Sequence, residues 1–286
     1  MNVQDIDERE EAAKGKFLRE FGDQYNLALS ALSALDDGLS LLDGQRLSDP
    51  AARVQAWLAV GHRNALSGAL SVMSRGYFRE AATLIRAAFE DWGTQKYLAR
   101  HPEKALAYAE IDVTAPFRPK RGLPSFADIW KKLEGEGPEQ APRVYAWLCS
   151  HTHPSPTGLR STYRRDAQGF WIHLSPSFDT GLTRQALAYW FQVAQLQLRA
   201  TQELQLLVLG SSDPEWSKRG STLSSQLVAA TSELASGIAA DALDQIGDAL
   251  KRQGVSLEDW IESGREERGI LVETLYGIRG DDPPKG

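Results

Sequence analysis

The sequence predicts an all-α fold, a helical bundle with a helical C-terminal appendage. Apolar residues recur three or four positions apart through most of the 286 residues, which is the spacing of one helix face. Glycine and proline separate these periodic segments, at Gly44, Asp49-Pro50, Gly76 and Gly210. The composition, with 42% hydrophobic and 24% charged residues, is that of an ordinary globular protein.

Four helices are expected in the first part of the chain. Asp49 caps the second helix, and Pro50 occupies its first turn, where proline is tolerated. Gly76 separates the second helix from the third. The expected ranges are residues 6–42, 50–74, 77–100 and 102–111.

The middle of the chain is predicted to be less regular. A basic, proline-containing loop covers 115–124, and Ser125 caps a short helix over 126–133. Another short helix covers 138–151. From 152 to 180 the helical pattern stops, and 169–174 has the aromatic and β-branched residues of a short extended piece.

Helical periodicity returns near Thr180, which is expected to cap a helix over 182–209 that Gly210 ends. The turn residues at 211–214 predict a boundary. We therefore expect a bundle domain over 1–210 and an appendage over 211–286. The appendage contains helical segments at 222–238, 240–253 and 257–276 and a disordered Gly/Asp/Pro tail.

Composition excludes several classes of protein. A net charge of −6 argues against a global field for nucleic acid, so any such binding needs a local basic patch. One cysteine excludes an internal disulfide and a Cys-based zinc site. The acidic N-terminus does not resemble a signal peptide, and no apolar run is long enough to span a membrane. The sequence predicts a soluble cytoplasmic protein without a membrane partner or a cofactor.

The helix over 77–100 carries a polar stripe opposite its apolar face, formed by Arg79, Arg86, Glu90 and Tyr97. Arg86 and Glu90 are four residues apart on this stripe and can form an ion pair, with small Ala82 and Gly93 at its margin. One interpretation is a solvated surface with a weak pair. In the other, the small residues admit a neighbouring helix, and Arg86 and Glu90 point into a cleft where the guanidinium holds a phosphate or carboxylate.

Reactive side chains are concentrated where the helix over 138–151 ends. Val144, Leu148 and His151 share one face, so His151 is expected to point inward and His153 is not. Either His151 is a hydrogen-bonded core residue or it is a catalyst. His151 and His153 supply only two ligands, too few for a metal site, and a Gly-x-Ser-x-Gly nucleophile motif is absent.

A basic cluster follows, and it is interleaved with aromatic residues. Arginines of this type suit phosphate contacts, and aromatic rings suit base stacking. Salt bridges to some of the 38 acidic residues would also explain the arginines. The candidate nucleic-acid-binding residues are Tyr145, His153, Arg160, Arg164 and Arg165.

Residues 249–260 resemble a helix-turn-helix superficially. The residues that would form the recognition helix are acidic, including Glu258, Asp259 and Glu262, and phosphates would repel them. The segment is better explained as a partner-binding or dimerising tail. The C-terminal helices are therefore expected to bind a protein partner or a second copy of the chain.

The helix bearing Arg86-x-x-x-Glu90, followed by Tyr145 to Ser150-His151 and a Pro/Ser turn, resembles a bacterial all-helical family similar in architecture to HEPN domains. The resemblance covers roughly residues 50–205. It implies a HEPN-like bundle acting in bacterial stress or phage defence. HEPN relatives include metal-independent ribonucleases of toxin and defence systems, and also catalytically inactive interaction modules.

The resemblance implies catalytic roles for His151, Arg86 and Glu90. His151 would be a general acid or base on RNA, and an arginine would stabilise phosphorane charge. HEPN nucleases carry Arg, four to six residues and then His on one helix, whereas seven residues separate Arg143 from His151 here. RNA binding or cleavage, and a non-catalytic interaction or dimerisation module, both remain open at this point.

Overall fold

The fold is described from a computed structural model of the chain. The described residues are 3–45, 47, 49–109, 125, 126, 128, 129, 133, 141–152, 163–166, 169–172, 176 and 178–252. The helices are α1 (Val3–Ser40), α2 (Pro50–Ser74), α3 (Phe78–Arg100), α4 (Pro102–Ala109), α6 (Ala141–Thr152), α7 (Thr180–Leu209) and α8 (Pro214–Arg252), and the strands are β1 (Tyr163–Asp166) and β2 (Gly169–Ile172). The all-α prediction is confirmed, apart from one short hairpin.

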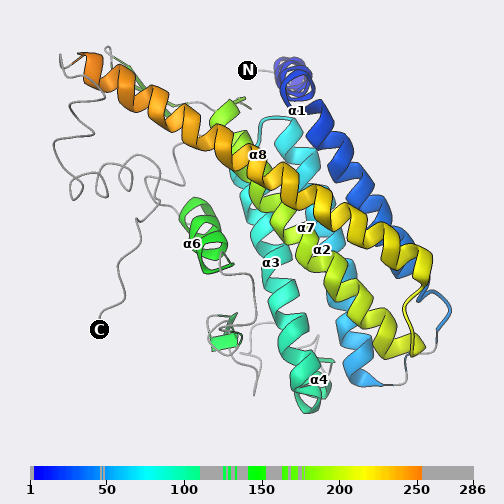
Figure 1. The fold of residues 1–286 in the computed structure, drawn as a ribbon. Helices are drawn as coiled ribbons and strands as arrows, with labels where there is room; N and C mark the ends of the chain where they lie inside the picture. Colours follow the sequence, from blue (N-terminus) through cyan, green and yellow to red (C-terminus); the bar gives the residue numbers. More distant parts are fainter. Residues whose placement is uncertain are drawn as a thin grey trace, which may run out of the picture.

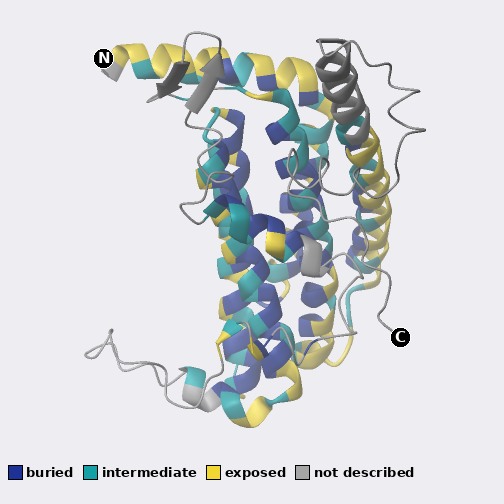
Figure 2. Cartoon of the chain, turned by 90° about the vertical axis from the view of Figure 1, so that its left-hand side faces the viewer, coloured by how far each residue is buried: buried dark blue, intermediate teal, exposed yellow. Residues whose placement is uncertain are grey.

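The long helices lie side by side, and α6 lies against α3 (Figure 1). In the view of Figure 2 their buried faces point toward one another. One apolar core joins α1, α2, α3, α6, α7 and α8, and its largest fully buried side chains include Trp190, Phe17, Phe89 and Phe191. Burial of such rings is the main stabilising contribution to a bundle of this kind.

The first helix bends at Phe21, whose φ of −131° and ψ of 28° are not helical. The part before the bend crosses one end of the bundle (Figure 2). There the Tyr77 hydroxyl donates to Glu10 Oε1 at 2.7 Å, and Thr180 Oγ1 donates to Glu20 Oε2 at 2.8 Å. These bonds attach the N-terminal arm to the α2–α3 turn and to the start of α7.

The predicted helix ends are largely confirmed. Asp49 accepts from the amides of Ala51 and Ala52 at 3.2 and 3.1 Å, so it caps α2 as expected. Gly210 follows α7 with φ of 74°, a left-handed conformation that glycine adopts without strain. The cap predicted for α7 was wrong by one residue, because Asp179 accepts from the Leu182 amide at 2.8 Å.

The C-terminal helix differs most from its prediction. The segments expected at 222–238 and 240–253 are parts of one helix, α8. It continues through Gly237, where an added Cβ would meet the Arg184 side chain at 3.0 Å. The first half of the predicted appendage therefore packs into the bundle. Residues 257–276 lie outside the described residues.

Tryptophan 216 shows how closely α8 joins the bundle. Its indole Nε1 donates to the Ala34 carbonyl at 2.6 Å, and its ring lies 2.6 Å from where a Cβ on Gly38 would stand. Only glycine at position 38 permits this approach. Leu223, Leu227 and Leu234 of α8 are buried in the same core.

The hairpin lies in the region where helical periodicity stops. Its strands are antiparallel, with Tyr163 opposite Ile172 and Asp166 opposite Gly169. The extended piece expected at 169–174 is confirmed as β2. The register also pairs Arg164 with Trp171 and Arg165 with Phe170. None of the described helices is long and apolar enough to cross a membrane.

Candidate functional site at the contact of α3 and α6

The polar stripe of α3 lies partly beneath other elements. Ala82 is fully buried, and an added Cβ on Gly93 would stand 2.6 Å from the Phe126 ring. The small residues at the margin of the stripe therefore allow other residues to pack there, as the second of the two interpretations required. Tyr97, assigned to the polar stripe from its spacing, is instead 3% exposed and packs in a second apolar cluster with Val54.

Arg86 and Glu90 form the expected ion pair, with Nε and Oε1 2.8 Å apart. Their side chains are 24% and 33% exposed, so the pair is half-buried. Arg86 Nη1 donates to Thr152 Oγ1 at 2.9 Å, and the Tyr145 hydroxyl donates to Glu90 Oε1 at 3.3 Å. We call Arg86, Glu90, Tyr145 and Thr152 the α3–α6 joint.

The electrostatics of the joint favour the paired state. Burial opposes the charge on Arg86, but the hydrogen bond and charge of Glu90 outweigh it, so the pKa of Arg86 is raised. Burial, then Cys149 and Glu90, raise the pKa of Tyr145 to about 12. The phenol is consequently a proton donor at neutral pH. The guanidinium carbon of Arg86 lies 5.6 Å from the centre of the Tyr145 ring.

His151 points inward, as its helical spacing predicted, and it is 4% exposed. Its ring centre lies 5.4 Å from Phe78 and 4.1 Å from Trp147. Nδ1 lies 2.9 Å from the Trp147 carbonyl oxygen and 3.1 Å from Ser150 Oγ. Because a carbonyl can only accept, we assign the neutral-ring proton to Nδ1, which leaves the lone pair on Nε2.

The structure brings together only part of the predicted site. Arg86 and Glu90 meet Tyr145, but the contact of Arg86 at the end of α6 is Thr152. His151 is one position earlier, about 100° around the helix, and meets Phe78 and Trp147. His153 and Arg160 lie outside the described residues, and Arg164 and Arg165 are in β1.

Sequence reasoning missed two members of this region, Thr152 and Cys149. Both were recoverable from spacing, because Tyr145, Cys149 and Thr152 follow one another at four and three residues and share a helix face. It also missed His62 of α2, which is completely buried. Burial lowers the pKa of His62 to about 3, against smaller opposing effects of the Val193 and Ala88 backbone.

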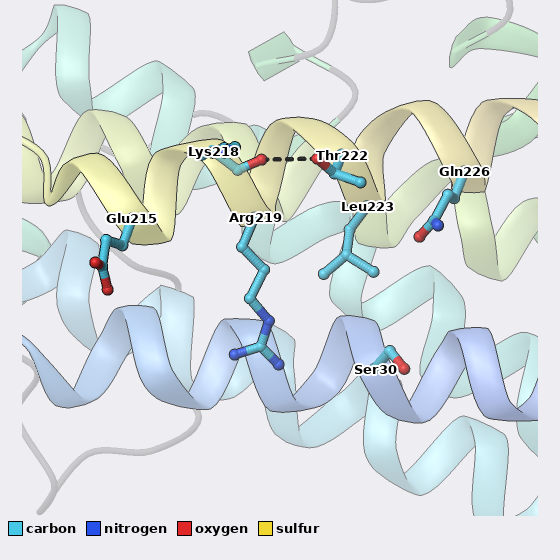
Figure 3. Close-up of a pocket in the computed structure, with 7 residues that line it drawn as sticks. All are labelled: Ser30, Glu215, Lys218, Arg219, Thr222, Leu223 and Gln226. Atoms are coloured by element: carbon cyan, nitrogen blue, oxygen red, sulfur yellow. Dashed lines mark hydrogen bonds between the residues drawn. The ribbon is translucent and has the colours of Figure 1, made fainter.

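A surface groove of about 600 Å³ lies elsewhere, between α1 and α8 (Figure 3). Arg219 and Leu223 extend from α8 toward α1 across it. Arg219 is already bound by Asp37 and by Ser33 Oγ, the latter at 3.1 Å. The groove is open to solvent, and it is lined by Ser30, Glu215, Lys218, Arg219, Thr222, Leu223 and Gln226.

Among the described residues, no group of three or more His, Cys, Asp or Glu side chains is arranged to hold a metal ion. A scan against protein-family models finds no match, and searches of the curated proteins and of the solved structures find no similar chain.

Proposed function

We propose that this chain is a non-catalytic helical interaction module in which the α3–α6 joint and His151 hold α6 on the bundle. The burial of His151 carries the proposal. The His151 ring is 4% exposed, lies between Phe78 and Trp147, and is hydrogen-bonded to a backbone carbonyl. This is the environment of a structural core residue. A general acid or base has to reach its substrate within hydrogen-bond distance.

The arginine supports the same proposal. Arg86 uses Nε on Glu90 and Nη1 on Thr152, so two of its nitrogens already have partners within the fold. The Glu90 carboxylate, bonded to Nε, would repel a phosphate brought to the same guanidinium. The exposed apolar side chains Val228 of α8 and Leu206 and Leu207 of α7, each about half exposed, are candidate contacts for a protein partner or a second copy.

The second candidate is a HEPN-like RNA-binding protein or metal-independent ribonuclease of bacterial stress or phage defence. A specific observation favours it: Arg86 and Glu90 keep 24% and 33% of their side chains exposed, beside the aromatic ring of Tyr145. Guanidinium and aromatic groups together suit phosphate contact and base stacking. The Nε2 lone pair of His151 would be the proton acceptor in such a reaction.

One set of variants separates the two candidates. The purified chain is incubated with total RNA and with tRNA, beside His151→Ala, Arg86→Ala and Arg79→Ala, the last being an arginine seven residues earlier on α3. The interaction module predicts no cleavage by any of the four proteins and reduced thermal stability for His151→Ala. Wild-type cleavage that His151→Ala abolishes while keeping its helical content and melting temperature would overturn it.

A further inference from the structure

Five polar side chains lie in the interior of the bundle with incomplete hydrogen bonding. Each is at most 2% exposed and has at least one nitrogen or oxygen without a hydrogen-bond partner in the described part of the chain. Such groups are few in native proteins, and each requires a physical explanation. We call them the polar seam: His62 of α2, Gln95 of α3, and Gln197, Thr201 and Gln205 of α7.

The α7 members lie on one face of that helix, because they are four residues apart. His62 is within hydrogen-bond reach of the backbone of Val193, which is one turn before Gln197, but its neutral ring has only one N–H, so its second nitrogen needs another partner. The line therefore runs from His62 along α7 through Gln197 and Thr201. At its end the Gln205 Nε2 donates to the Gly38 carbonyl of α1 at 3.1 Å, and Gln205 Oε1 has no partner among the described residues.

Gln95, the remaining member of the seam, lies on the same line. His62 also lies against Ala88 of α3, and Gln95 is seven residues, or two turns, beyond Ala88. A short turn joins α2 to α3, so the two helices are antiparallel neighbours. Buried Gln55, seven residues before His62, is consequently level with Gln95. Figure 1 shows α2, α3 and α7 adjacent along this length.

Protein contacts alone leave these groups poorly satisfied. A buried polar group without a partner loses its hydration and gains nothing in exchange, so several on one line would offset much of a domain's net stability. Ordered water relieves this cost where several polar groups can share each molecule. The seam meets that condition, because its members follow one another at single helical turns and offer both donors and acceptors.

We propose that the polar seam binds a line of ordered water molecules between α2, α3 and α7. The waters connect His62, Gln197 and Thr201 and continue toward Gln95 and Gln205. They hold the three helices together at positions where an ordinary bundle has interlocked apolar side chains.

The test replaces single seam groups by apolar groups of similar shape. Thr201→Val and Gln197→Met are compared with the matched control Thr231→Val, whose hydroxyl donates to the Leu227 carbonyl of its own helix at 2.7 Å. Magnetic relaxation dispersion of water ¹⁷O counts the long-lived internal waters of each full-length protein. We expect each seam variant to lose roughly one long-lived water relative to the wild type, and the control to lose none.

Two results would overturn the proposal. One is an unchanged water count in both seam variants. The other is a raised melting temperature in Thr201→Val without loss of a water, because removing an unsatisfied hydroxyl from a dry core stabilises the folded state. Circular dichroism verifies that each variant keeps its helical content, so the water counts compare folded proteins.

Discussion

The α3–α6 joint and the polar seam both place polar side chains between helices, but they satisfy them differently. In the joint, Arg86, Glu90, Tyr145 and Thr152 are partners of one another, and the ion pair keeps contact with solvent. In the seam the side chains are buried, and several of their polar atoms have no partner among the residues that the structure describes. A single substitution in the joint removes one of several mutual contacts, so we expect a moderate loss of stability. The stability of the seam depends on whether other groups in the interior complete its hydrogen bonds.

The largest effect expected of a substitution at neutral pH is at His151, which fastens α6 to the bundle beside the joint. His151→Ala removes a buried ring between Phe78 and Trp147 and its bond to the Trp147 carbonyl. We expect the free energy of unfolding to fall by about 2–4 kcal/mol, measured by urea denaturation. His101→Ala is the control, because that side chain is 40% exposed and packs on one ring, Tyr97, so it should lose clearly less stability than His151→Ala. Equal losses in the two variants would contradict a core role for His151.

A methyl group at the margin of the joint should also be costly. Gly93→Ala places a Cβ 2.6 Å from the Phe126 ring, which itself packs on Tyr145. Overpacking of this kind costs about 1–3 kcal/mol in thermal or urea unfolding. Gly22→Ala in α1 is the control, since nothing lies within 4 Å of its added Cβ. A Gly93→Ala protein as stable as the wild type would mean that Phe126 does not pack there.

The seam predicts a dependence of stability on pH. The pKa of His62 is about 3 in the folded chain against 6.5 as the ordinary value, so between these values the unfolded chain binds a proton that the folded chain does not. His62 therefore costs no stability above pH 6.5. Below that pH it lowers the free energy of unfolding by about 1.4 kcal/mol per pH unit, until about pH 3.

Comparison with His62→Gln isolates this contribution from that of the carboxylates, which also titrate in acid. Chemical denaturation of both proteins between pH 7 and pH 4 should give curves that converge or cross as the pH falls, because only the wild type loses the His62 contribution. Parallel curves over this range would show that His62 titrates alike in the folded and unfolded chain.

Helical periodicity and the positions of glycine and proline were sufficient to predict most helices and the inward direction of His151. They were insufficient wherever a distant contact decides the outcome. A break was expected between the segments at 222–238 and 240–253, yet α8 is one helix from Pro214 to Arg252 that packs on α1 and α7. Tyr97 has the spacing of the polar stripe, but it is buried with Val54 and Leu98, which come from two different helices.

The sequence predicted the Arg86–Glu90 pair within α3, but it did not predict the contacts between α3 and α6. The four-residue spacing of Arg86 and Glu90 predicts their pair, whatever surrounds it. That Thr152 accepts from Nη1 of Arg86 depends on how α6 is rotated on α3. This rotation follows from the packing of Phe78 and Trp147, which lie 69 positions apart in the sequence and whose ring centres are 5.8 Å apart.

The smallest expected effect tests whether the joint acts as one unit. Tyr145→Phe removes a donor to Glu90 Oε1 without changing the ring that stacks on Phe89, so it should cost only about 0.5–1.5 kcal/mol. A double-mutant cycle with Glu90→Gln, followed by urea unfolding, measures how strongly the two groups depend on each other. If the joint is mutually satisfied, the double variant loses less stability than the two single losses added together. Strict additivity would mean that Tyr145 and Glu90 act independently, and that the half-buried Arg86–Glu90 pair is an ordinary surface pair beside α6.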